Sequence, residues 1–254
     1  MKPSRMKEVL IDVLKTRWPV FIWGPPGVGK SSLVKQIASE KKLKLLDVRA
    51  SLLDPTDLRG IPYVTSERAK WAPPAFLPNE KKSEGILFFD ELNAAPPLVQ
   101  ASLYQLTLDR RLGEYELPEK WRILAAGNRA EDASVVFRMP AALSNRFIHL
   151  DFEHNLEDWR NWAIDNKIHP LVLGFLGTRG ELLFKMSSSE RAFPTPRSWE
   201  IMSDQLHIFD NFNQIEEKRA EIKSLFGPEY AITTIQQRHE EMFSWLNLIY
   251  QNVY

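Results

Sequence analysis

The sequence of 254 residues contains no cysteine, so disulfide bonds and thiolate metal sites are excluded. Its five histidines are scattered without the spacing of metal ligands, so they predict no metal site of their own. No apolar run approaches the roughly 20 residues that a transmembrane helix needs. Residues 1–15 lack the apolar core of a signal peptide. We therefore expect a cytoplasmic protein without a membrane partner.

An excess of charge of one sign is also lacking. Lysine plus arginine and aspartate plus glutamate number 33 each, so no global basic field favours nucleic acid. A small basic cluster at 41–44 is more typical of a solvated face. We do not expect nucleic acid as the partner.

A glycine-rich segment at 24–31 fits the phosphate-binding pattern G-x-x-x-x-G-K-[ST]. It follows a short apolar run at 19–23 and precedes a helical pattern at 32–38, as a phosphate loop requires. We expect Lys30 to reach the β- and γ-phosphates and Ser31 to offer its hydroxyl to Mg²⁺. The residues predicted to bind the nucleotide are Gly24, Pro25, Pro26, Gly27, Val28, Gly29, Lys30, Ser31 and Ser32.

Strand and helix patterns alternate along the first part of the chain. Strands are predicted at 19–23, 43–48, 86–90, 121–126 and 147–152, with helices at 5–16, 32–38, 96–108 and 139–145. The pattern predicts an α/β fold at 1–152, a five-stranded parallel sheet flanked by helices. The segment 52–79 contains five prolines and cannot be one regular element, so it is predicted to be a functional loop or an insertion. Residues 153–254 lack strand signals and predict a small all-helical domain, with a long helix at 231–253.

Polar residues end or follow two of the predicted strands. Asp90 ends the most apolar strand and is predicted to lie near Mg²⁺, and Glu91 to polarise an attacking water. Asn128 ends the fourth strand, where an amide can bind the γ-phosphate or orient that water. In isolation, a solvated strand end would be the better explanation of Asp90 and Glu91, and an Asx turn the better explanation of Asn128.

Two arginines are candidates for neutralising the negative charge that develops on the γ-phosphate. Arg146 precedes the fifth strand, and Arg197 lies at a helix start in the helical part. A surface salt bridge is the alternative for each. Arg110 and Arg111 form a second basic pair. The sequence therefore leaves open which arginine neutralises phosphate charge in a neighbouring subunit.

Taken together and in this order, the segments 24–31 and 87–93, Asn128, 145–147 and 194–197 resemble an AAA+ ATPase of the MoxR-like group. The resemblance covers about 5–205. It implies ATP and Mg²⁺ as ligands, and it implies these roles: Lys30 and Ser31 in Walker A, Asp90 and Glu91 in Walker B, Asn128 as sensor 1, Arg146 as arginine finger and Arg197 as sensor 2. It further implies a homo-oligomeric, usually hexameric ring that remodels or activates a partner protein, often one with a von Willebrand factor A domain. It also implies an insertion near the second helix, which is consistent with 52–79.

Other functions remain open from sequence alone. One is a DNA-directed AAA+ motor or loader. Another is a nucleotide-dependent switch with little turnover, such as a GTPase, for which 57–60 imitates a D-x-x-G element. At 166–169 the sequence begins like N-K-x-D but lacks the acid that would read guanine. A third is a small-molecule kinase.

Overall fold

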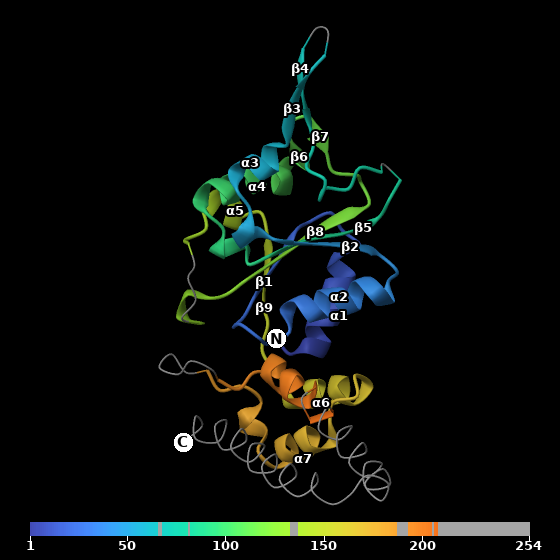
Figure 1. Cartoon of the computed structure of the whole chain (residues 1–254), viewed down its shortest axis with the longest axis vertical. Helices are drawn as coiled ribbons and strands as arrows, with labels where there is room; N and C mark the ends of the chain where they lie inside the picture. The colour runs from blue at the N-terminus through green and yellow to red at the C-terminus, as the bar shows by residue number, and fades with distance from the viewer. Residues whose placement is uncertain (66–67, 81, 133–136, 187–192, 205, 208–254) are drawn as a thin grey trace, which may run out of the picture. The chain divides into compact units, whose positions relative to one another are not determined.

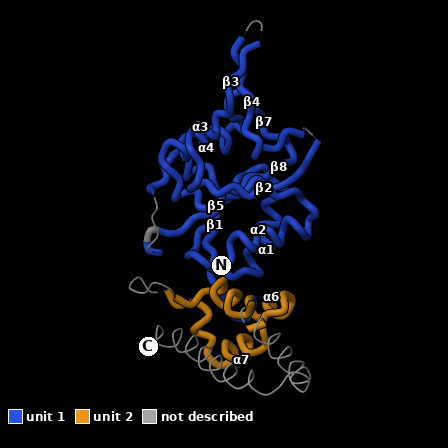
Figure 2. The backbone as a smooth tube through the Cα atoms, in the orientation of Figure 1, with its two compact units in different colours: residues 1–158 blue, residues 159–254 orange. Residues whose placement is uncertain are grey.

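The computed structural model describes residues 1–65, 68–80, 82–132, 137–186, 193–204 and 206–207. The chain divides into two compact units, Met1–Asp158 and Trp159–Tyr254, which are coloured separately in Figure 2. The division predicted after residue 152 and the division after Asp158 both fall near the start of the same helix. The helix predicted at 231–253 lies outside the described residues.

A five-stranded parallel sheet forms the centre of the first unit and confirms the predicted α/β class. Its strands are β1 (Val20–Trp23), β2 (Lys44–Arg49), β5 (Gly85–Asp90), β8 (Trp121–Gly127) and β9 (Ile148–Asp151). The strand order is β2-β5-β8-β1-β9. The interior strand β5 is apolar up to Asp90 and buried along almost its whole length, as expected when helices cover both faces of a sheet.

Helices lie on both faces of this sheet (Figure 1). One face carries α1 (Pro3–Val13) and α2 (Lys30–Glu40). The other carries α3 (Pro55–Arg59), α4 (Pro97–Asp109) and α5 (Ala141–Ser144). Prolines stand at the starts of α1, α3 and α4, where a missing backbone N–H costs no helical hydrogen bond.

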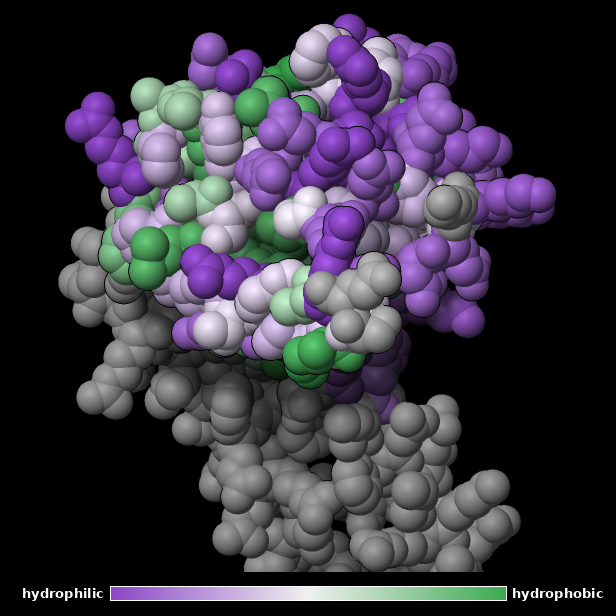
Figure 3. Space-filling model, turned by 90° about the horizontal axis from the view of Figure 1, so that it is seen from above, coloured by the Kyte–Doolittle hydropathy of each residue, from purple (hydrophilic) through white to green (hydrophobic). Residues whose placement is uncertain are grey.

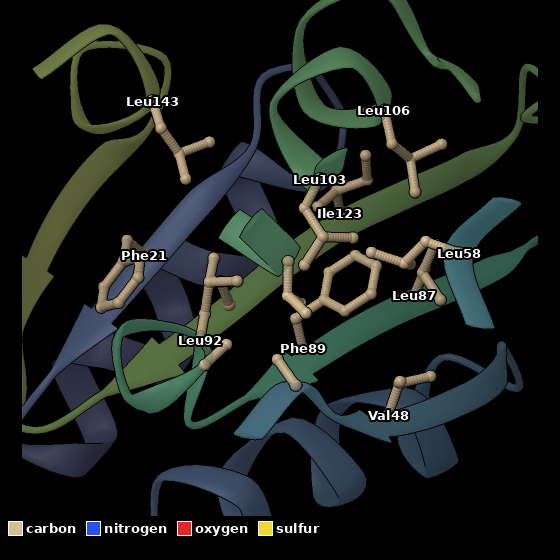
Figure 4. Packing of buried hydrophobic residues seen from close by; sticks show 14 of the residues in the cluster. Phe21, Val48, Leu58, Leu87, Phe89, Leu92, Leu103, Leu106, Ile123 and Leu143 are labelled. Carbon is tan, nitrogen blue, oxygen red and sulfur yellow. The ribbon is translucent and has the colours of Figure 1, made fainter. Parts of the chain in front are cut away.

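A cluster of buried apolar side chains fills the space between the sheet and α4 (Figure 4). Leu103 and Leu106 of α4 point toward Leu87 and Phe89 of β5 and Ile123 of β8. Each fully buried side chain of this size stabilises the fold by roughly 1.5–3 kcal/mol relative to exposure. This packing fixes β5 and β8, so the residues that follow these two strands are held in place.

The proline-rich segment 52–79 folds as several short elements. After η1 (Ala50–Leu52) and α3, the strands β3 (Ile61–Val64) and β4 (Ala69–Ala72) form an antiparallel hairpin that projects from the first unit (Figure 1). Gly60 lies at its base with φ 78°, and a Cβ there would come within 1.9 Å of the Ala72 carbonyl oxygen. A second small hairpin, β6 (Arg111–Leu112) and β7 (Tyr115–Glu116), follows α4.

The described part of the second unit is helical. It contains the end of α6 (Leu156–Asp165), α7 (Pro170–Thr178), η4 (Gly180–Leu183) and a helix covering 196–204. Trp199 joins two of these, because its indole N–H donates to the Leu182 carbonyl at 2.9 Å. Within the described residues of the whole chain, no helix combines the length and hydropathy needed to cross a bilayer.

Candidate functional site

The site lies along the carboxyl edge of the sheet. Because all five strands are parallel, their carboxyl ends meet at this one edge, where ligands of such sheets bind. The last residue of β1, Trp23, is in register with Gly127 on one side and Asp151 on the other. The loop that leaves β1 therefore starts between the ends of β8 and β9.

The glycine-rich loop has the curled backbone that its sequence predicts. Gly27 and Gly29 have φ angles of 76° and 102°, which side-chain-bearing residues adopt rarely. Gly29 directly precedes α2, so the helix N-terminus faces the loop and favours negative charge there. A Cβ at Gly24 would come within 2.8 Å of the Phe152 carbonyl oxygen, so this glycine permits close contact with the chain that leaves β9.

The Lys30 side chain folds back into this loop. Its ammonium donates to the carbonyl oxygens of Gly24 at 2.6 Å and Pro25 at 2.9 Å. It also donates to Oδ1 of Asn128 at 2.9 Å. Lys30 is only 8% exposed, so these oxygens replace the water that a buried ammonium needs. The predicted phosphate-binding cation and the predicted sensor thus lie in direct contact.

Ser31 and Asp90 are the residues predicted to hold Mg²⁺. The Ser31 hydroxyl donates to Oδ2 of Asp90 at 2.6 Å. A hydroxyl and a carboxylate are hard oxygen ligands of the kind that Mg²⁺ takes alongside nucleotide phosphates. In the described part of the chain, no group of three or more histidine, aspartate and glutamate side chains forms a separate metal site. The donor set therefore fits a Mg²⁺ shared with a nucleotide.

Glu91 has an unusual backbone. Its φ of 54° and ψ of 36° are left-handed, a conformation that costs a non-glycine residue energy and recurs at functional sites. Its N–H donates to Oδ1 of Asp90 at 3.0 Å, and its Oε2 accepts from the Ser51 hydroxyl at 2.6 Å. Sequence reasoning missed Ser51. The register pair Arg49↔Asp90 explains the contact, because it brings the residues after β2 beside those after β5.

Asn128 is held from a second side by Asn93. The Asn93 amide donates to the Asn128 carbonyl at 2.7 Å and is itself buried. A Cβ at Gly127 would come within 2.2 Å of Asn93 Oδ1, so the space for Asn93 depends on glycine there. Sequence reasoning gave Asn93 no role, although it is the last residue of the 87–93 segment that contributes to the resemblance.

The arginine candidates occupy different environments. Arg146 is exposed, and its guanidinium lies 6.0 Å from the ring centroid of Tyr104 and 3.4 Å from its hydroxyl. Arg110 is partly buried and donates to the Pro118 and Trp121 carbonyls at 2.8 and 2.9 Å. Burial lowers the pKa of Arg110, and the nearby Arg122 lowers it further. Arg111 pairs with Glu116 across the small hairpin.

Arg197 belongs to the second unit. It is exposed in the first turn of the helix covering 196–204. Thr195 and Ser198 cap this turn reciprocally, with N–H···O distances of 2.8 and 3.1 Å. The cap fixes the backbone at Arg197, and its role toward a nucleotide stays a prediction.

The segments that imitate a GTPase have structural roles. Oδ2 of Asp57 accepts from the Asp54 N–H at 2.8 Å and closes the capping box of α3. The Asn166 amide donates to the Trp162 carbonyl at 2.8 Å, at the end of α6. The basic cluster 41–44 lies at the turn between α2 and β2, at the opposite edge of the sheet from the loop.

Comparison with known proteins identifies related sequences. Residues 19–147 match the family model described as AAA domain (dynein-related subfamily). MoxR from Methylorubrum extorquens is 28% identical over 174 residues, which are 65% of this chain and 50% of that protein. Midasin from Giardia intestinalis is also 28% identical over 174 residues, 65% of this chain and 4% of that protein. The chain thus spans at most half the length of these relatives.

A solved structure supports the fold alone. A RuvB mutant from Thermotoga maritima superposes with a TM-score of 0.54 at 16% sequence identity. The match covers 83% of this chain and 64% of that one.

The contrast between Arg110 and Arg146 predicts different effects on stability. Arg110→Ala should lower the free energy of unfolding by about 1.5–3 kcal/mol, the range for hydrogen bonds made by a charged group. Arg146→Ala, at an exposed position, should change it by no more than about 0.5 kcal/mol. Urea denaturation followed by circular dichroism measures both. Equal losses in the two variants would contradict the structural role assigned to Arg110.

Proposed function

The chain belongs to the AAA domain family, dynein-related subfamily. On this basis we propose that it binds ATP with Mg²⁺ and hydrolyses the ATP. We propose further that hydrolysis serves to remodel or activate a partner protein. The observation that carries the proposal is the set of contacts among four predicted site residues. Lys30 touches Asn128, and Ser31 touches Asp90. The first two residues of α2 thus lie within hydrogen-bonding distance of the last residue of β5 and of the residue that follows β8.

Each group then has a definite task. Lys30 exchanges loop carbonyl oxygens for phosphate oxygens, which are stronger partners because they are charged. Ser31 and Asp90 hold Mg²⁺, which supplies neutralisation of the phosphate charge. Asn128, released from Lys30, is close enough to the loop to orient a phosphate or a water. Glu91 takes the proton of the attacking water once its carboxylate is free of Ser51.

The exposure of Arg146 supports its assignment as a finger that acts on a neighbouring subunit. An arginine that neutralises charge in a second chain has to be accessible on the first, as Arg146 is. Arg110 is a poorer candidate, because its guanidinium is already bonded to carbonyl groups of its own chain. We infer a homo-oligomeric ring, hexameric by resemblance, with Arg197 responding to the nucleotide from the helical unit.

The hairpin of β3 and β4 is the proposed contact surface for the partner protein. Its register places Pro62 opposite Trp71 and Val64 opposite Ala69, so one face is entirely apolar. Val64 is 86% and Trp71 is 43% exposed. Figure 3, which looks at this end of the molecule, shows hydrophobic residues among hydrophilic ones. A two-stranded hairpin with both faces open is marginal alone, which favours a partner that covers it.

Mixing two inactive variants tests the action of Arg146 between subunits. Arg146→Ala should bind ATP normally but lose hydrolysis steeply, because arginine fingers contribute on the order of 10³–10⁵ in rate. Lys30→Ala should keep its finger but bind ATP weakly. Mixed rings contain junctions in which both parts are intact, so ATP hydrolysis should partly return on mixing.

Co-assembly of the two variants has to be shown in the same mixture by size-exclusion chromatography with light scattering. No recovery in such rings would count against Arg146. An Arg111→Ala variant, assayed in parallel, tests the alternative finger, because Arg111 is also exposed.

A second test concerns the partner surface. The double variant Val64→Ser with Trp71→Ser should keep basal ATP hydrolysis within about twofold of wild type, since exposed substitutions perturb stability little. Purified von Willebrand factor A domains from the same organism, added one at a time, should stimulate hydrolysis by the wild type but not by this variant. Trp18→Ser removes an exposed tryptophan elsewhere and should keep the stimulation. Equal stimulation of all three proteins would rule out the hairpin as the contact.

A further inference from the structure

We propose that Arg129 is a positioning residue that couples the nucleotide contact of Asn128 to the segment leaving β9. The inference rests on the proposed function, because it takes Asn128 to sense the γ-phosphate. Arg129 directly follows Asn128 and lies outside every motif identified in the sequence. Its contacts give it a task that a surface arginine would not have.

The position of Arg129 follows from the strand register. Gly127 and Asp151 flank Trp23, the last residue of β1, on opposite sides. The Arg129 guanidinium donates to Oδ1 of Asp151 at 2.9 Å. The ion pair therefore joins the loop after β8 to the end of β9, spanning the strand that lies between them. The phosphate loop begins at Gly24, the residue that directly follows this middle strand.

Further contacts make the connection short and direct. The Arg129 N–H donates to Oδ2 of Asp132 at 2.7 Å, which fixes the backbone of the turn that carries it. The Phe152 N–H, next to Asp151, donates to the Trp23 carbonyl at 2.7 Å. The Phe152 carbonyl oxygen also abuts Gly24 of the phosphate loop. A shift at Asn128 is thus transmitted through its neighbour Arg129 and the ion pair to Asp151, the last residue of β9.

Within a few residues after β9 the chain enters α6, the helix in which the second unit begins. A nucleotide-dependent movement of Asn128 would consequently be passed to the segment 151–155. When Lys30 turns to a phosphate, the Asn128 amide loses Lys30 as a partner. With ATP it gains the γ-phosphate, which ADP lacks. The position of Asn128, and with it that of Arg129, therefore differs between the ATP and ADP states. A purely structural ion pair would respond equally to both nucleotides.

The experiment compares affinities for a non-hydrolysable ATP analogue and for ADP by titration calorimetry. Arg129→Gln should reduce the ratio of the two affinities by about three- to fivefold, the size of effect that a partly exposed ion pair can exert. Asp151→Asn should have the same effect, and the double variant should be no worse than either single variant. Lys44→Gln, which breaks an exposed ion pair with Glu80 at the opposite sheet edge, should leave the ratio unchanged.

The charge-exchanged pair, Arg129→Asp with Asp151→Arg, should restore the ratio at least in part and keeps the test open if a single variant folds poorly. Equal weakening of analogue and ADP, or additive effects of the two single variants, would overturn the proposal. Asn128→Ala separates this failure from failure of the proposed function. If Asn128→Ala alters the ratio and Arg129→Gln does not, the positioning role alone is wrong. If Asn128→Ala has no effect, the sensing role on which both depend is wrong.

Discussion

The buried ammonium of Lys30 is the interaction on which the rest of the site depends. Moving an ammonium out of water is costly unless oxygen atoms surround it, and here Gly24, Pro25 and Asn128 provide them. Two of these oxygens require the curled loop, and the third requires β8 to end beside β1. The glycines, the parallel sheet and the strand order thus all serve the placement of one positive charge.

The same charge explains why the site needs little rearrangement to receive a nucleotide. The groups that fit phosphate and Mg²⁺ are already paired with one another, Lys30 with carbonyl oxygens and Ser31 with Asp90. Binding then exchanges partners instead of assembling the site, and preorganised groups of this kind stabilise developing charge most effectively. Glu91 has a strained backbone conformation, and its carboxylate accepts from Ser51, so the hydrolysis that we propose would require one more local change than binding.

The sequence predicted what is encoded locally. The loop at 24–31 carries its own turn chemistry, and each of the five strands contains apolar residues in a short segment, so the loop and the strands were predicted from local sequence. The contacts of Ser51, Asn93 and Arg129 depend on which strands lie side by side and in what register, and no local pattern contains that information. The hairpin of β3 and β4 was missed because five prolines obscure its alternation. The sequence alone could not show that Arg110 is partly buried and bonded to backbone carbonyl groups while Arg146 is exposed.

The central claim, that this sheet edge hydrolyses ATP with Glu91 as the base, is tested most directly by separating binding from turnover in Glu91→Gln. The glutamine keeps the shape and loses the proton acceptor, so ATP affinity measured by titration should stay within about twofold while Mg²⁺-dependent hydrolysis falls by about 10²–10⁴. Glu80→Gln, which removes an exposed carboxylate paired with Lys44 at the amino end of β2, should change neither. Hydrolysis at the wild-type rate by folded Glu91→Gln would contradict the account.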